Sequence, residues 1–222
     1  MTDISGNINS LLAEIPSTVK LVAVSKTKPV GQIIQAYNAG QRYFGENRVQ
    51  ELLNKIDKLP RDIEWHMIGH LQSNKVKALV PFISLIQSVD SYKLLKTINA
   101  EALKISRVVD CLLQFHIAQE ETKFGFSISE LDEVFGSLEF DNLKNVRICG
   151  VMGMATLTSD TKQVHKEFSN LKNYYNSLKS RYFKDMPHFK EISMGMSDDY
   201  KIAIEEGSTI IRIGSLIFGK RN

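Results

Sequence analysis

In this 222-residue chain, Lys26 is placed where a lysine side chain could form a covalent bond with a ligand. It follows an apolar run that ends at Val24, and Pro29 then breaks the strand pattern. Because side chains alternate along a strand, Val22, Val24 and Lys26 share one face. If that face lines a barrel, the lysine stands at the mouth, where desolvation favours a neutral amine that can condense with an aldehyde. A strand-end lysine that simply reaches solvent is the alternative.

Two Gly/Ser sequences late in the chain could bind a phosphate. Ser197 follows Gly195 at the expected start of a helix, where backbone N–H groups and the helix dipole attract an anion. Gly214 lets the backbone approach a ligand, and Ser215 adds a second hydroxyl. Ser197 as an ordinary N-cap and Gly214 as an ordinary turn are the alternatives. Together, opposite a strand-end lysine, the two sequences favour a phosphorylated ligand.

Three other polar side chains are predicted to face the same region. Arg212 points inward by period two, and once buried it needs a partner, either a ligand acceptor or a carboxylate such as Glu46. Asn47 ends a strand, where it binds a ligand or caps the next helix. His66 lines the ligand or is a hydrogen-bonded core histidine. His66 and His70 lie too far apart on a strand and loop to chelate a metal, so no metal site is expected.

Alternating strands and helices would position these residues. A helix is expected over residues 4–14, before the first strand. Short apolar strands are then predicted at residues 21–26, 42–46, 64–69, 84–89, 108–117, 146–154, 189–194 and 209–213. Amphipathic helices are predicted between them, among others at residues 47–58, 129–138 and 160–182. Ser73 and either Asp90 or Ser91 are expected as N-caps.

Eight strand–helix units predict the α/β class and a closed (β/α)₈ TIM barrel, with the helix at residues 4–14 as an addition. Residues 1–222 are expected to form this single domain, because no Pro/Gly/Ser linker interrupts them. An open doubly wound sheet is the structural alternative. It is less favoured because no G-x-G-x-x-G sequence follows the first strand.

The composition restricts the class of protein. A net charge of +3 from nearly balanced acids and bases argues against a nucleic-acid-binding surface. No apolar run is long enough to cross a bilayer and no signal-peptide pattern opens the chain, so we expect a cytoplasmic protein without membrane contact. Cys111 and Cys149 lie in apolar runs and are predicted to be buried free thiols.

A series of short motifs extends along almost the whole chain. They are AVSKTKP at 23–29, FGEN at 44–47, WHMIG at 65–69, LQSNK at 71–75, SMGMSDD at 193–199, RIGS at 212–215 and IFG at 217–219. In this order they resemble the pyridoxal phosphate (PLP) homeostasis protein family, which is related to the N-terminal barrel of alanine racemase. The resemblance implies a barrel of the fold-type III PLP-protein kind.

The resemblance also implies how the cofactor is held. PLP would be bound covalently, as a Schiff base, through Lys26. The other implied cofactor-binding residues are Ser197, Gly214 and Ser215 at the phosphate, Arg212 at the pyridine nitrogen, and Asn47, His66 and Met194 around the ring. No function is attached to His70.

The function that the resemblance implies is to buffer PLP and deliver it to apo-enzymes. An arginine beside the pyridine nitrogen disfavours its protonation, so the ring is a poor electron sink. Alanine racemase also uses a tyrosine base from a second domain, which is not expected here, so we expect no efficient racemase activity. A weak racemase-like PLP enzyme and a cofactor-free Schiff-base aldolase are the alternatives. A monomer is expected.

Overall fold

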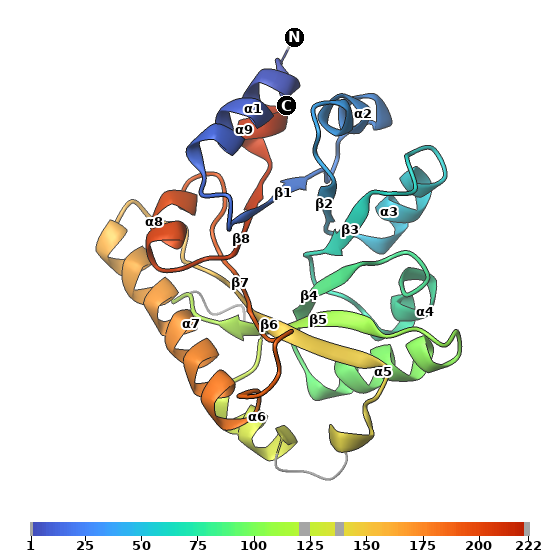
Figure 1. Ribbon diagram of the computed structural model, residues 1–222, viewed down its shortest axis with the longest axis vertical. Helices are drawn as coiled ribbons and strands as arrows, with labels where there is room; N and C mark the ends of the chain where they lie inside the picture. The colour runs from blue at the N-terminus through green and yellow to red at the C-terminus, as the bar shows by residue number, and fades with distance from the viewer. Residues whose placement is uncertain (1, 120–124, 136–139, 220–222) are drawn as a thin grey trace.

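The strands of the computed structural model close into a barrel (Figure 1). The structure describes residues 2–119, 125–135 and 140–219. Within them, eight parallel strands follow one another around the barrel, and β8 pairs with β1. The strands are β1 (Lys20–Val24), β2 (Tyr43–Glu46), β3 (Glu64–Met67), β4 (Leu85–Val89), β5 (Val109–His116), β6 (Val146–Met154), β7 (Glu191–Ser193) and β8 (Ile210–Ile213). The predicted closed (β/α)₈ barrel is confirmed.

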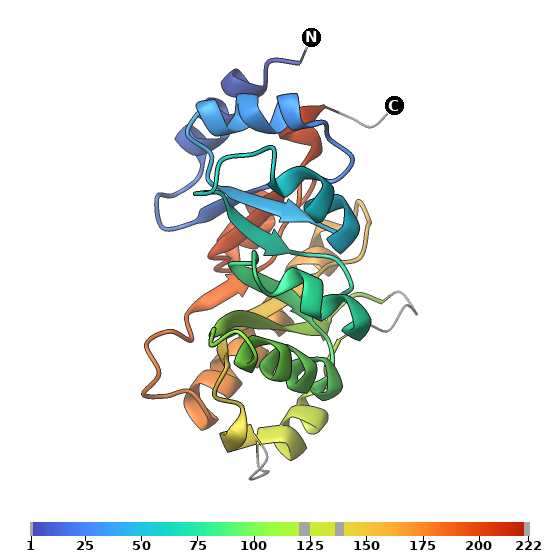
Figure 2. The same ribbon diagram turned by 90° about the vertical axis from the view of Figure 1, so that its right-hand side faces the viewer.

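Helices surround this barrel on the outside (Figures 1 and 2). They are α1 (Ile4–Glu14), α2 (Val30–Asn38), α3 (Val49–Ile56), α4 (Val76–Leu79), α5 (Tyr92–Leu103), α6 (Ile128–Phe135), α7 (Thr161–Arg181), α8 (Tyr200–Glu205) and α9 (Ser215–Phe218), with 3₁₀ turns at Ser73–Lys75 and Phe140–Asn142. The added N-terminal helix α1 has the bounds that the sequence predicts. It lies beside α9, where Asn7 Nδ2 donates to the Ile217 carbonyl at 3.0 Å.

Apolar side chains gather in two clusters of very different size. The larger cluster lies between the sheet and the helices, and includes Ile33, Leu52, Phe168 and Ile213. The smaller cluster fills part of the barrel interior with Val22, Leu85, Leu112, Cys149, Met152 and Ile210. The rest of the barrel interior is left to polar side chains.

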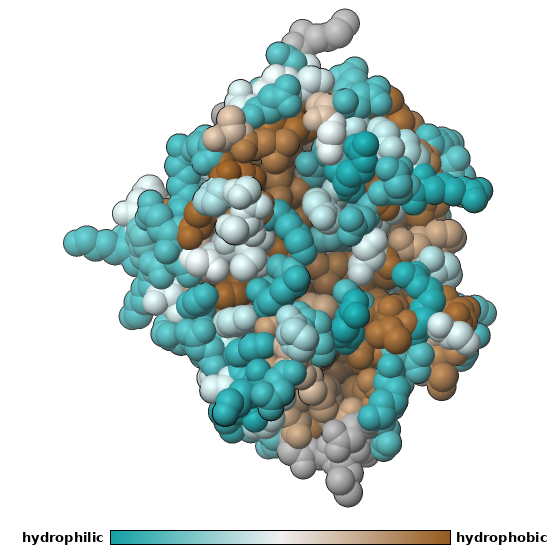
Figure 3. All heavy atoms as spheres, in the orientation of Figure 1, coloured by the Kyte–Doolittle hydropathy of each residue, from teal (hydrophilic) through white to brown (hydrophobic). Residues whose placement is uncertain are grey.

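The outside of the molecule is mostly polar. In Figure 3 hydrophilic side chains dominate the protruding surface, and hydrophobic ones lie largely in recesses between them.

Strand β1 ends at Val24, two residues before the predicted end. The N–H of Ser25 still donates to the Gly45 carbonyl of β2 at 3.0 Å, but the N–H of Lys28 then returns to the Ser25 carbonyl at 3.0 Å. This turn stops the ladder. Lys26 therefore lies in the loop after the strand and not on the strand itself, which corrects the prediction.

The helix ends show which predicted caps are used. The Ser91 hydroxyl accepts from the N–H of Leu94 at 3.3 Å and caps α5, and Asp160 caps α7. Ser73 does not act as an N-cap, because Gln72 precedes the 3₁₀ turn and makes no side-chain cap bond. The predicted helix at residues 129–138 is α6, which ends at Phe135; its predicted end at Leu138 lies outside the described residues.

Both cysteines are buried and unoxidised, as predicted, and burial raises the pKa of the Cys149 thiol to about 12. Across the described residues, no helix combines the length and the apolar character needed to cross a membrane.

Substitution of Gly150 tests the packing of β6 against β7. Gly150 has φ of +153°, and a Cβ there would lie 1.8 Å from the Glu191 carbonyl oxygen, so we expect Gly150→Ala to destabilise the fold by about 4 kcal/mol or more. Gly31 in α2 is the matched control, because a Cβ there meets nothing within 4 Å. Gly31→Ala should stabilise the fold by about 0.4–1 kcal/mol in urea denaturation. Equal effects of the two substitutions would contradict the described packing.

Candidate functional site

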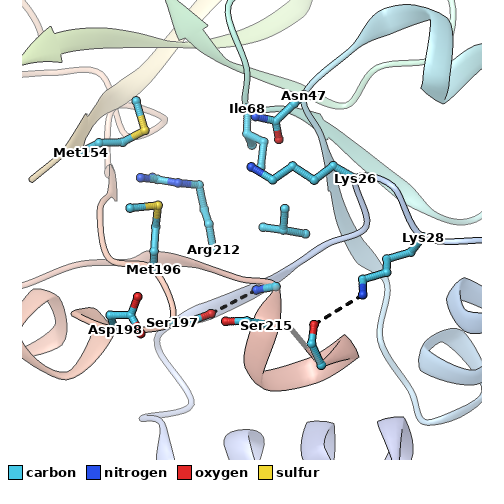
Figure 4. A pocket seen from close by; sticks show the side chains of 13 residues that line it. Lys26, Lys28, Asn47, Ile68, Met154, Met196, Ser197, Asp198, Arg212 and Ser215 are labelled. Carbon is cyan, nitrogen blue, oxygen red and sulfur yellow. Dashed lines mark hydrogen bonds between the residues drawn. The ribbon is translucent and has the colours of Figure 1, made fainter. Parts of the chain in front are cut away.

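A cavity of about 240 Å³ lies at the carboxyl ends of the barrel strands (Figure 4). Its walls come from the loops after β1 and β7, from the ends of β2, β3, β6 and β8, and from the start of α9. The lining residues are Val24, Lys26, Lys28, Asn47, Ile68, Met154, Met196, Ser197, Asp198, Arg212, Gly214, Ser215 and Gly219. This is the end of a (β/α)₈ barrel at which active sites are found.

Most of the residues singled out from the sequence meet in this cavity. Its lining contains Lys26, Asn47, Ser197, Arg212, Gly214 and Ser215. The two Gly/Ser sequences also touch, because the N–H of Gly214 donates to Ser197 Oγ at 3.4 Å. Ser197 does not open the following helix, however. Residues 197–199 form a turn, and α8 begins only at Tyr200.

The turn before α8 is held by Asp199. Its Oδ1 accepts from the N–H of Met196 at 2.5 Å. Burial raises the pKa of this carboxyl, and the bond to Met196 and the charge of Arg212 oppose that shift. The loop that carries Ser197 is thus fixed by a hydrogen bond within itself and not by a helix N-terminus.

His66 and Met194 do not line the cavity. His66 lies on the inward face of β3, but Ile68 occupies the mouth above it, and the ring instead lines a separate cavity of about 340 Å³ that also includes Lys20. Burial, helped by the charge of Lys20, lowers the pKa of His66 to about 3, so the ring is neutral. Met194 is fully buried in the cluster between sheet and helices, on the opposite face from Ser193. Both residues were expected around the ring of the ligand, and neither is among the residues that line this cavity.

Arg212 is buried at the inner wall of the cavity, with only 4% of its surface exposed. Its Nη2 donates to the Gly153 carbonyl at 2.9 Å, and its Nη1 donates to the Ser193 hydroxyl. Burial lowers the pKa of the guanidinium to about 10, and the nearby Asp199 opposes this shift. Glu46, which the sequence suggested as a partner, does not bond to Arg212.

Glu46 instead faces outward from β2 and belongs to a buried ion pair beneath α3. Its Oε1 accepts from Lys55 Nζ at 2.8 Å and from the Ser25 hydroxyl at 2.6 Å. Lys55 Nζ also donates to the Ser25 carbonyl at 3.0 Å. Period-two alternation could have revealed this, because Glu46 falls on the same strand face as Phe44, which packs in the outer cluster.

The same cluster fixes the loop on the other side of Lys26. Lys55 Nζ donates to Glu51 Oε1 at 2.6 Å, and that oxygen accepts from the N–H of Thr27 at 2.5 Å. Thr27 has φ of +64°, a strained conformation for a β-branched residue. Ser25 and Thr27 are both anchored to the Glu46–Lys55–Glu51 cluster, so Lys26 is held from both sides and directed into the cavity (Figure 4).

Several lining residues were not assigned a role from the sequence. Lys28 Nζ donates to the carbonyls of Phe218 and Gly219 at 3.2 and 3.4 Å, and so ties the Lys26 loop to the end of α9. Lys28 follows Lys26 by two residues, and this spacing was the one sequence signal that it could lie at the same cavity. Met154 and Met196 supply apolar walls that no motif indicated. Among the described residues, no cluster of three His, Cys, Asp or Glu side chains could hold a metal ion.

A family model, a curated relative and solved structures each match this chain over most of its length. The family model described as "Alanine racemase, N-terminal domain" matches residues 1–222. A pyridoxal phosphate homeostasis protein from Aquifex aeolicus is 42% identical over 204 residues, which cover 91% of this chain and 87% of the relative. PipY from Synechococcus elongatus, solved without PLP, has a TM-score of 0.90 at 35% identity, over 97% of this chain and 100% of that one. PipY with PLP bound has a TM-score of 0.88, with the same identity and coverage.

Removing the cation of the buried cluster tests its role in the fold. Lys55→Met leaves Glu46 buried without its cation, so we expect a loss of about 3–5 kcal/mol in the free energy of unfolding. The double variant Lys55→Met with Glu46→Gln should recover most of that loss, because it removes both charges. Urea denaturation of the single and double variants measures this. Strictly additive losses would show that the two charges do not interact.

Proposed function

The chain belongs to the alanine racemase N-terminal domain family, and on this premise we propose that it binds PLP in the strand-end cavity and serves in intracellular PLP homeostasis. The observation that carries the proposal is the convergence of Lys26, Arg212 and the Ser197 and Ser215 hydroxyls on one cavity (Figure 4). The pyridoxal phosphate homeostasis protein at 42% identity and the PLP-bound PipY structure support the proposal.

The residues of the cavity fit this cofactor. Asn47 Oδ1 is buried without a hydrogen-bond partner among the described residues, so it can accept from a donor on a ligand. Ser197 and Ser215 offer hydroxyls at the end of the cavity where Gly214 lacks a side chain, which suits a phosphate. Ile68 and Met154 provide apolar walls for a ring.

Lys26 is proposed as the covalent anchor. When bound, PLP supplies an aldehyde that condenses reversibly with a primary amine. Lys26 presents such an amine to the cavity from a loop whose two flanking residues are anchored. Arg212 is proposed to face the pyridine nitrogen. A guanidinium there disfavours protonation of that nitrogen and leaves the ring a poor electron sink.

The lining of the cavity favours holding the cofactor over turning over amino acids. Among the described lining residues there is no His, Tyr or Cys, and Asp198 is the one carboxylate. Lys28 is bonded to backbone carbonyls. A two-base proton transfer needs a second group facing the ring from the side opposite Lys26. We therefore propose buffering of PLP, and its release to apo-enzymes of the cytoplasm, with the protein acting as a monomer.

Near-visible absorbance tests the proposal. We expect the wild-type protein to take up added PLP with a band distinct from that of free PLP, and we expect Lys26→Ala to lack this band. Lys28→Ala is the matched control, because it removes a neighbouring lysine of the same cavity but leaves the proposed anchor. Transfer of the bound PLP should then restore activity to an added apo-enzyme, whereas the protein alone should not racemise alanine.

A wild-type protein that takes up no PLP would overturn the proposal. Such a protein with reactivity at Lys26 toward a sugar phosphate would instead be a cofactor-free Schiff-base aldolase. Rapid racemisation by the PLP-loaded protein would show an enzyme in place of a reservoir.

A further inference from the structure

Beneath the cavity, the barrel interior carries a line of buried polar side chains. His66, Gln87, Ser193 and Arg212 come from β3, β4, β7 and β8, and each is at most 4% exposed. Polar groups are buried at a cost unless every one is hydrogen-bonded. The small apolar cluster of the interior shows that the same space can accept hydrophobic side chains. These polar residues therefore call for an explanation that packing does not provide.

The four side chains form one continuous relay of hydrogen bonds. Arg212 Nη1 donates to the Ser193 hydroxyl, and Ser193 Oγ donates to Gln87 Oε1 at 2.6 Å. Gln87 Nε2 lies 2.8 Å from His66 Nδ1. The relay begins at the cavity that Arg212 lines and ends at the separate cavity that His66 lines.

The Arg212 guanidinium and the orientation of the Gln87 amide together set the direction of the bonds. A guanidinium can only donate, so Ser193 Oγ accepts from it, and Ser193 Oγ in turn donates to Gln87 Oε1, which faces the hydroxyl. The amide NH₂ of Gln87 then faces the histidine, so Nδ1 must accept and the ring proton resides on Nε2. An accepting Nδ1 requires a neutral imidazole. Burial and the charge of Lys20 keep the His66 ring neutral, because both lower its pKa.

We infer that Gln87 and Ser193 are positioning residues that hold the Arg212 guanidinium in its direction toward the cavity. The inference rests on the proposed function to the extent that the cavity holds PLP. The hydrogen bonds that the Arg212 side chain makes to described residues go to neutral acceptors, the Ser193 hydroxyl and the Gly153 carbonyl. The Gly153 carbonyl holds only the Nη2 end of the guanidinium, so the orientation of the guanidinium also depends on the Ser193 hydroxyl at Nη1. That hydroxyl would rotate if its bond to Gln87 Oε1 did not hold it.

The tautomer of His66 tests the relay without any cofactor. Nitrogen NMR of the PLP-free protein should show neutral His66 with its proton on Nε2. Gln87→Met, which keeps a long side chain but removes both amide bonds, should leave a mixture of the two tautomers. A wild-type ring with its proton on Nδ1 would overturn the inference, and so would an unchanged tautomer in Gln87→Met.

PLP affinity and absorbance test the link to the cavity. Gln87→Met and Ser193→Ala should each weaken PLP binding about three- to tenfold and shift the absorbance band, since each removes part of one hydrogen-bonded unit. The double variant should lose little more than either single variant. Ser193→Ala deletes only a hydroxyl, so it serves if Gln87→Met does not fold.

Ser208→Ala is the matched control. Ser208 is also buried between β7 and β8, but its hydroxyl bonds to the carbonyls of Met194 and Ile210, outside the relay. It should keep the wild-type affinity and spectrum. If the wild-type protein binds PLP and the relay variants bind it equally well, the inference is overturned but the proposed function is not. A wild-type protein that binds no PLP would overturn the proposed function, and the His66 tautomer would still decide the relay.

Discussion

The pairing of β8 with β1 is the constraint on which the site depends. It places Val22 opposite Arg212 and Ala23 opposite Ile213. One step further, Val24 lies beside Gly214, where an added Cβ would already be 3.4 Å from the Val24 Cβ. Residues nearly two hundred positions apart in the sequence therefore share one rim. Without this closure, the Lys26 loop and the Gly/Ser sequence after β8 would belong to two edges of an open sheet, and neither could complete a site alone.

Within this frame, the site is held by polar interactions that are buried at a cost. On the outer side of β2, Glu46 and Lys55 fix Ser25 in the loop that carries Lys26, and Glu51, bonded to Lys55, holds the strained Thr27. On the inner side, the relay of hydrogen bonds from Arg212 to His66 lies in the wall beneath the cavity. A barrel built for stability alone would fill both places with apolar side chains, since a buried ion pair seldom adds stability over a hydrophobic equivalent. We attribute their presence to the positions they impose on Lys26 and Arg212, two of the three cationic side chains among the described residues that line the cavity.

Much of the fold and part of the site could be predicted from the sequence. The period of the apolar residues gave the strands, the N-terminal helix and the closed barrel, and strand-end position brought Lys26, Arg212 and Gly214 to one cavity. The errors arose where tertiary structure decides. Period two places His66 on the correct face, but it does not tell at which depth in the barrel the ring lies. Met194 was assigned to the ring by the resemblance alone, and it packs in the cluster between sheet and helices and does not line the cavity.

Peptide mapping after borohydride reduction identifies the lysine that holds PLP, because reduction makes a reversible bond between PLP and a lysine permanent. Digestion and mass spectrometry of the PLP-loaded, reduced protein then identify the modified residue. We expect the added pyridoxyl mass on Lys26, on a peptide that also contains Lys28 and must be sequenced to separate the two lysines. Modification of Lys28 or of a lysine outside the cavity, with Lys26 unmodified, would contradict the assignment of the anchor.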